Sequence, residues 1–173
     1  MIETERTFLL KSNIEMLESL VEDKHLFHNR VFLNAHPSWL SQTTYKEILN
    51  IISVASLGYD ECYMPWLVAM KDSLEIVGDI SLTRDTEYQN VLNLGYAIAK
   101  PYRNHHIMRE ALYALMNIIK ECDGFAGLKF IYAKIHRDNI ASQRCIESVG
   151  FKLDIENSFE TLLYKYPLQD YKN

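Results

Sequence analysis

The 173 residues suffice for one domain with a sizeable hydrophobic core and would make two domains cramped. The 23 acidic residues outnumber the 18 lysines and arginines, and the net charge of -5 argues against a nucleic-acid surface, which needs clustered basic charge. No apolar run approaches the roughly 18 residues that span a bilayer, and the start, MIETERTFLL, lacks the layout of a signal peptide. We expect a single cytoplasmic domain, residues 1–173, that binds neither nucleic acid nor membrane.

The three cysteines, Cys62, Cys122 and Cys145, stand at scattered positions. Their spacing matches neither a CxxC metal knuckle nor the even-numbered framework of a disulfide-rich protein. We therefore expect reduced, mostly buried thiols that act as small apolar side chains, and we expect no metal site.

Hydrophobic spacing predicts short strands separated by amphipathic helices. Apolar residues recur every three to four positions where we expect a helix, and they alternate with polar residues where we expect a strand. The expected elements are, in chain order, a strand at 5–10, helices at 12–24 and 41–57, strands at 66–71, 74–84 and 91–100, a helix at 107–122, a strand at 128–135, a helix at 139–149 and a strand at 159–166.

Capping residues mark the ends of these helices. Ser12 or Asn13 is suited to the N-cap of the first helix, because a short polar side chain there accepts hydrogen bonds from free N–H groups. Gly58, residues 123–124 and Gly150 follow the other three helices, and glycine readily adopts the left-handed conformation that ends a helix.

The order of elements predicts the fold class. The strands at 66–71, 74–84 and 91–100 are joined by short turns, which favours an antiparallel meander. The helix at 107–122 then connects two strands and is expected to be a crossover. This order predicts an α+β or mixed-sheet fold with helices on both faces of the sheet.

The stretch YRNHHIMREAL, residues 102–112, lies between a predicted strand and a predicted helix. The free N–H groups at the start of a helix attract anions, so a turn of this kind often binds phosphate. Phosphate-binding turns usually contain glycine, however, and this one has His105, His106 and Met108 instead. From the residues alone, a phosphate site and a plain strand-to-helix turn both remain open.

Three stretches together resemble the GNAT acetyltransferases, in the branch that acetylates protein N-termini such as those of ribosomal proteins. They are IETERTFLL, LGYAIAKPYRNHHIMREAL and HRDNIASQRCIESVGFKL, which occur in the family's order and spacing. The resemblance implies the GNAT fold, with a mixed, mostly antiparallel sheet that opens into a V. It also implies an enzyme that transfers the acetyl group of acetyl-CoA to a primary amine by direct attack.

The resemblance assigns the cofactor loop. The family binds the pyrophosphate with the pattern Q/R-x-x-G-x-G/A, in which Arg103 fills the first position here. His106 and Met108 stand where glycine and glycine or alanine are usual, and Asn104 replaces a frequent further glycine. The N–H groups of 104–108 can still point at phosphate, because every helix start leaves free donors. The predicted loop residues are Arg103, Asn104, His105, His106, Ile107 and Met108.

Two interpretations of the histidine pair remain open. In one, the imidazoles of His105 and His106 hold phosphate and replace some of the backbone contact that glycine would allow. In the other, they are exposed residues at the start of a helix in a protein that binds coenzyme A weakly or not at all.

The resemblance also assigns a strand and a helix to the cofactor. Main-chain groups of Tyr96, Ala97, Ile98 and Ala99 are expected to hold the pantetheine arm and the thioester, on a strand splayed from its neighbour by a bulge. Ala97 replaces a usual tryptophan. The alternative is a plain core strand.

Asn139 and Ser142 match the family motif N-x-x-S. The resemblance places Asn139 beside the pantetheine and the Ser142 hydroxyl near the sulfur, although Asn139 as a simple N-cap would also explain the motif. Many relatives have a tyrosine as general acid where this chain has Ile146. Ser142 or water is therefore expected to return the proton to the thiolate.

The general base is the least defined part of the expected site. Relatives often have a glutamate where this chain has Asn93, and the asparagine side chain cannot titrate. Glutamate is also frequent in relatives where this chain has Tyr132. Tyr132, Asp79 and His136 are candidates, and we name Tyr132 with Ser142 as the predicted catalytic residues. A backbone carbonyl with ordered water is a further alternative.

The acceptor is expected to be a protein N-terminal amine, with a polyamine or other small amine as the second choice. A GNAT-like binding or regulatory protein without turnover is the rival from another class. The segments before and after the second helix are rich in aromatic residues that could line an acceptor pocket, form a homodimer contact or belong to the core. These residues are Phe27, Phe32, Trp39, Tyr59, Tyr63 and Trp66.

Overall fold

The computed structural model describes residues 1–55, 64–85, 87–122, 125, 127–155 and 160–168. Its elements are β1 (Ile2–Glu3), β2 (Thr7–Lys11), α1 (Ile14–Glu22), α2 (Lys24–Val31), β3 (Asn34–Ala35), α3 (Gln42–Ala55), β4 (Trp66–Met70), β5 (Glu75–Arg84), β6 (Val91–Ile98), a 3-10 turn (Lys100–Tyr102), α4 (Ile107–Glu121), β7 (Phe130–His136), α5 (Ile140–Val149), β8 (Lys152–Ile155) and β9 (Thr161–Pro167).

The strands form one sheet in the order β1-β2-β4-β5-β6-β7-β9-β8, and β3 adds a short parallel pairing to β5. The strands β4, β5 and β6 are antiparallel neighbours, as the meander prediction required. The neighbours β6 and β7 are parallel, because α4 carries the chain across the sheet between them. The predicted mixed, mostly antiparallel sheet and the crossover helix are therefore confirmed.

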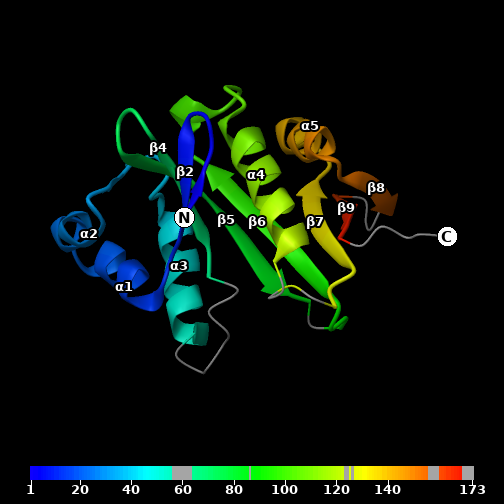
Figure 1. Cartoon of the computed structure of the whole chain (residues 1–173), viewed down its shortest axis with the longest axis horizontal. Helices are drawn as coiled ribbons and strands as arrows, with labels where there is room; N and C mark the ends of the chain where they lie inside the picture. The colour runs from blue at the N-terminus through cyan, green and yellow to red at the C-terminus, as the bar shows by residue number, and fades with distance from the viewer. Residues whose placement is uncertain (56–63, 86, 123–124, 126, 156–159, 169–173) are drawn as a thin grey trace.

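Helices cover both faces of the sheet. A Cβ built on Gly78 of β5 would lie 3.2 Å from the Met108 Cε, so this side of β5 faces α4. The next residue, Asp79, points to the opposite side and accepts a hydrogen bond from Trp39 in the segment before α3. Figure 1 shows α4 over the central strands and α1 and α2 at the end where β2 and β4 lie.

Helix ends agree with the capping predictions wherever the structure describes them. The Asn13 side chain accepts from the Met16 N–H at 2.8 Å, which makes Asn13 the N-cap of α1. Gly150 ends α5 with a φ of 111°, in the left-handed region. The predicted stops at Gly58 and at residues 123–124 lie outside the described residues.

Several elements were not expected. The helix α2 is capped by Asp23, whose side chain accepts from the His25 N–H at 2.8 Å, and its sequence KHLFHNRV lacks the one-sided apolar stripe that marks a helix. The strand β8 and the two-residue strands β1 and β3 were also missed, because elements this short have little periodicity of their own.

Of the aromatic residues considered for an acceptor pocket, most of those that the structure describes belong to the interior. Phe27 and Trp39 are buried, Trp66 is partly buried and only Phe32 is exposed; Tyr59 and Tyr63 lie outside the described residues.

The cysteine prediction was partly wrong. Cys122 is exposed at the end of α4, because the chain leaves the helix there, while Cys145 is half-buried. Cys62 is outside the described residues. Among the helices that the structure describes, none is long and apolar enough to cross a membrane.

Candidate active site

The centre of the sheet opens where two parallel strands part. Strands β6 and β7 pair only through Val91–Asn93 and Phe130–Tyr132, although both strands continue beyond these residues. The register of β6 runs without a shift against both neighbours, and the described shifts lie in the β4–β5 and β8–β9 pairs. The gap therefore arises from the end of pairing, and the bulge expected in this strand was wrong.

A cavity of 730 Å³ lies between the end of β6, the start of α4 and α5. This volume is within the range of about 300–1,000 Å³ that is usual for small-molecule sites. The cavity brings together ten of the twelve residues that the sequence assigned to the cofactor. They are Tyr96, Ala97, Ile98, Arg103, Asn104, His106, Ile107, Met108, Asn139 and Ser142.

The loop before α4 keeps a backbone shape that suits glycine. Asn104 and His106 have φ angles of 63° and 61°, in the left-handed region that L-residues rarely adopt. These are two of the positions where the family pattern has glycine. His106 is also the N-cap of α4 and makes no side-chain capping hydrogen bond, so the first N–H groups of α4 remain available to an anion.

The side chains of Ile107 and Met108 turn away from these N–H groups into the interior. Both are buried, and the Met108 Cε approaches β5 at Gly78. Only their main chain is then available to a ligand. His105 and His106 are exposed, but His105 is not part of the cavity lining.

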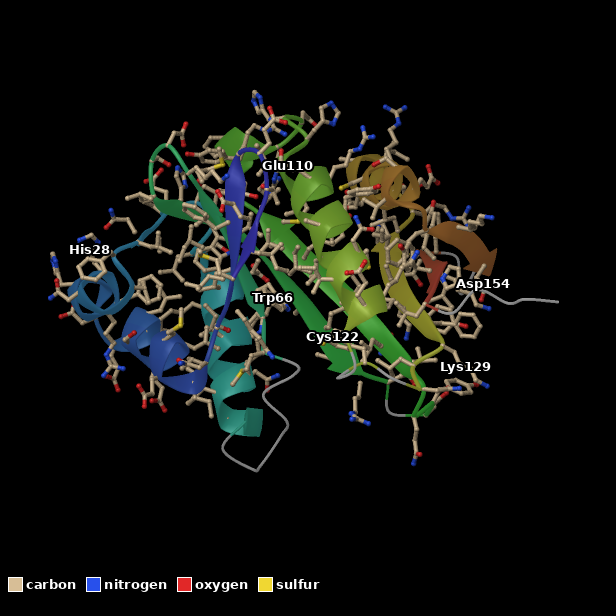
Figure 2. All side chains as sticks on the ribbon, in the orientation of Figure 1. His28, Trp66, Glu110, Cys122, Lys129 and Asp154 are labelled. Carbon is tan, nitrogen blue, oxygen red and sulfur yellow. The ribbon has the colours of Figure 1, made fainter. Side chains whose placement is uncertain are left out.

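A polar network holds the loop from outside the cavity. The Glu110 carboxylate on α4 accepts from the Thr4 hydroxyl at 2.6 Å, from the Arg6 N–H at 2.8 Å and from the Arg6 Nε at 2.7 Å. The Arg6 Nη1 donates to the His105 carbonyl at 3.0 Å. Figure 2 shows Glu110 at the end of α4 nearest the turn between β1 and β2. Partial burial raises the pKa of Glu110, but the hydrogen bonds from Thr4 and Arg6 outweigh it and hold the pKa below its usual value.

Tyr96 connects β6 to α5 across the cavity. Its hydroxyl donates to the Ser142 carbonyl at 3.1 Å, and the Cys145 side chain lies beside it. Burial raises the pKa of the Tyr96 phenol, so it stays protonated at neutral pH. The sequence pointed to the main chain of Tyr96, whereas the structure also brings its side chain into the cavity.

The next three residues of this strand segment differ in their placement. Ala97 and Ile98 line the cavity, but Ala99 is fully buried and lies outside the lining. The Ala99 N–H donates to the Val77 carbonyl at 2.6 Å and so remains in the sheet.

The predicted residues of α5 lie together at its start. The Asn139 Oδ1 accepts from the Ser142 N–H at 3.2 Å, so Asn139 is the N-cap that the alternative interpretation proposed, and it also lines the cavity. Ser142 is half-buried beside it. Ile146 is fully buried, which takes its position away from the cavity surface.

Tyr132 lies outside the cavity lining. It stacks on Phe130 with ring centroids 6.3 Å apart, and the Lys165 Nζ lies 5.9 Å from its ring. Asn93, its partner across the β6–β7 pair, donates to the Asp85 carboxylate at 2.9 Å. A catalytic role of Tyr132 stays a prediction.

Several lining residues were missed from the sequence. Arg109 and Arg144 add two exposed guanidinium groups to that of Arg103, and together these suit the phosphates of a large anionic ligand. Their sequence signal is slight, because an exposed arginine on a helix is common anywhere. The other missed lining residues are Tyr102, Ile140, Ala141, Cys145 and Ser148.

The fold, the parted strands and the uncapped start of α4 suit an acetyltransferase that binds acetyl-CoA. The sequence model of the acetyltransferase (GNAT) domain matches residues 15–152, most of the chain, and the chain belongs to the GNAT family.

Named relatives agree with this assignment. The chain is 23% identical to the uncharacterized N-acetyltransferase YjdG of Bacillus subtilis over 159 residues, which covers 89% of this chain and 90% of that protein. The solved ribosomal-protein-S5-alanine acetyltransferase of Vibrio fischeri shares 16% identity and a TM-score of 0.65, covering 99% of this chain and 98% of that one. The structure of RimL, a ribosomal L7/L12 alpha-N-protein acetyltransferase, in complex with coenzyme A shares 15% identity and a TM-score of 0.66, covering 95% of each chain. This protein is thus an acetyl-CoA-dependent acetyltransferase.

Proposed function

We propose that this acetyltransferase transfers the acetyl group to the N-terminal amine of a protein. The observation that carries the proposal is the exposed sheet surface beside the parted strands. Gly95 of β6 and Lys134 and His136 of β7 are exposed on the side opposite α4. An extended chain end can lie along such an open surface, whereas a small amine is better held by an enclosed pocket.

Two relatives support the same acceptor class. The Vibrio fischeri protein is a ribosomal-protein-S5-alanine acetyltransferase, and RimL acts as an alpha-N-protein acetyltransferase on ribosomal L7/L12. For the present chain, this acceptor class is a proposal that rests on the open surface together with these names.

The cavity residues are proposed to hold acetyl-CoA as the second substrate. The free N–H groups at the start of α4 and the guanidinium groups of Arg103, Arg109 and Arg144 would bind the phosphates. The half-buried main chain at Tyr96–Ile98 would pair with the pantetheine arm and hold the thioester oxygen, since β7 has left this part of β6 unpaired. The Ile98 carbonyl accepts from the Arg103 Nε at 3.3 Å, and the pantetheine would have to replace this hydrogen bond to pair there.

The chemical step then needs two proton transfers. The neutral amine attacks the thioester carbon, so that a C–N bond forms as the C–S bond breaks and coenzyme A leaves as a thiolate. The amine gives up one proton to water. The thiolate takes one from water or from the Ser142 hydroxyl, which then regains a proton from water. Ser142 is proposed for this role because it lines the cavity and Ile146 cannot donate.

Release of free thiol from acetyl-CoA tests this function. We expect release with a peptide that has a free N-terminus and none with the same peptide after its N-terminus is blocked. Ser142→Ala should lower the rate, and Arg103→Ala should weaken acetyl-CoA binding in a calorimetric titration. Release with polyamines but with no peptide would replace the proposed acceptor by a small amine.

The sequence also left open a binding protein without turnover. The family match makes this chain an acetyltransferase and does not favour that alternative. A single domain, a cytoplasmic location and a homodimer contact stay predictions from the sequence.

A further inference from the structure

Asp79 lies in the middle of β5 and is half-buried on the side of the sheet opposite α4. The Trp39 Nε1 donates to its Oδ1 at 2.7 Å, and Trp39 is itself buried. Among the described residues, Asp79 accepts no other hydrogen bond, so Oδ2 is left for a ligand or water. The carboxylate is thus held in position through one oxygen only.

Asp79 is next to a residue of the cavity lining. Its partner across the β5–β6 pair is Ala97, which lines the cavity. Directly paired residues on neighbouring strands point to the same side of the sheet, with side chains about 4.5–5.5 Å apart. Asp79 itself is not part of the cavity lining. It lies one strand away from the parted strands, on the same side of the sheet as the small side chain of Ala97.

The electrostatic surroundings make this carboxylate more basic than usual. Burial raises the pKa of Asp79, the hydrogen bond from Trp39 lowers it, and the negative charge of Glu47 on α3 raises it further. Together these effects give a pKa of about 6. At neutral pH the group is ionised and can pair with a cation.

We propose that Asp79 binds the ammonium group of the acceptor beside Ala97 and takes up its proton before attack. The ammonium donates to Oδ2, transfers one proton to it and becomes the neutral amine whose lone pair forms the C–N bond. The proton then passes to solvent, and Asp79 is a carboxylate again for the next acceptor. This inference rests on the proposed acetyl transfer and goes beyond it by naming the group that Asn93 cannot supply.

The decisive variant is Asp79→Asn, because the amide oxygen of asparagine can still accept from Trp39 while the group no longer takes a proton. We expect kcat/KM for the acceptor to fall about 100-fold or more, the usual contribution of a general base, with an unchanged Kd for acetyl-CoA. Asp85→Asn is the matched control, because Asp85 directly follows β5, accepts from Glu87 and Tyr88 of its own loop and from Asn93, and should leave turnover unchanged.

The pH dependence separates this role from a merely structural one. In the wild type, kcat/KM should fall below a pH of about 6 as Asp79 is protonated. Trp39→Phe should move this inflection to higher pH, because it removes a hydrogen bond that favours the ionised form. Glu47→Gln should move it to lower pH, because it removes a neighbouring negative charge. A general loss of stability would not shift the inflection in opposite directions.

Two results overturn the inference while leaving the proposed function intact. One is an Asp79→Asn enzyme that turns over like the wild type. The other is an inflection in kcat/KM that changes with the pKa of the acceptor amine and stays in place in Trp39→Phe and Glu47→Gln. If the wild type releases no thiol with any amine, the proposed function fails first, and the role of Asp79 fails with it.

Discussion

Two helices begin at the same cavity, and they begin in opposite ways. The helix α5 starts at Asn139, whose side chain accepts from the Ser142 N–H, and it ends at a glycine in the left-handed region. The helix α4 starts at His106, a non-glycine residue with a φ of 61° and no side-chain capping hydrogen bond. One start is satisfied within the protein, and the other is left open.

The capped start of α5 serves the stability of the fold, whereas the open start of α4 serves ligand binding. A capped start contributes to folding whether or not a ligand is present. An open start in a strained loop costs free energy in the unliganded protein, and an anion that accepts from its free N–H groups can offset this cost. We infer that α5 is a fixed wall of the cavity, whereas α4 is the part that depends on acetyl-CoA and on the Arg6–Glu110 contacts behind it.

The largest expected effect is at the Arg6–Glu110 contacts behind α4. Glu110→Gln should lower the free energy of unfolding by about 2 kcal/mol, since it weakens hydrogen bonds to a charged group from Thr4 and Arg6. Acetyl-CoA binding should weaken as well, because Arg6 also holds the His105 carbonyl. Urea unfolding and calorimetric titration measure the two effects. Glu3→Gln is the control: it breaks an exposed pair with Lys71 and should cost little.

The hydrogen bonds of the Glu110 carboxylate also predict that the stability of the fold decreases at low pH. The pKa of Glu110 is lower in the folded protein than its ordinary value of 4.5. Its contribution is therefore present above about pH 4.5 and is lost as the pH falls through the lower folded value. Unfolding free energies measured from pH 6 downward should decline more steeply in the wild type than in Glu110→Gln. Parallel curves would show that the carboxylate contributes nothing.

An intermediate effect is expected at the satisfied helix. Asn139→Ala should lower the free energy of unfolding by about 1 kcal/mol, the usual cost of removing an N-cap. Asn139→Asp keeps an acceptor at this position and should restore most of the loss. Thermal unfolding of the two variants provides the comparison. Equal losses in both would mean that Asn139 does not act through its cap.

The smallest expected effect is a gain in stability at the strained helix start. His106→Gly should raise the free energy of unfolding by about 0.5 kcal/mol, because relief of a left-handed L-residue slightly exceeds the entropy cost of glycine. His105→Gly is the matched control: the φ of His105 is not positive, so this change should destabilise.

Acetyl-CoA titration of His106→Gly also decides between the two interpretations of the histidine pair. Weaker binding would show that the imidazole contacts phosphate. Unchanged or tighter binding would show that the main chain suffices.

The fold could be predicted from the sequence because its long elements carry regular patterns. The helix α4 and the strand β5 have clear apolar periodicity, and the motif order fixed the crossover between β6 and β7. The helix α2 could not be found in this way, since its stability depends on the buried Phe27 and the Asp23 cap and less on an apolar face.

The candidate site was only partly within reach of the sequence. The motifs located the cofactor loop and the N-x-x-S segment, and the cavity contains most of both. The pairing of Trp39 with Asp79 joins residues 40 positions apart in the chain, and only the folded sheet brings them together. Arg109 and Arg144 could likewise not be identified as lining residues from the sequence, because a charged side chain on a helix does not indicate which ligand it faces.

The Arg6–Glu110 network has a consequence for hydrogen exchange. The Arg6 amide hydrogen is held by the Glu110 carboxylate, and the Arg6 guanidinium is held by the loop carbonyl of His105. Opening of the loop should therefore expose this amide to solvent deuterium, and a ligand that closes the loop should slow its uptake. Arg6 does not line the cavity, so its amide would report occupancy of the cofactor site without contact with the cofactor.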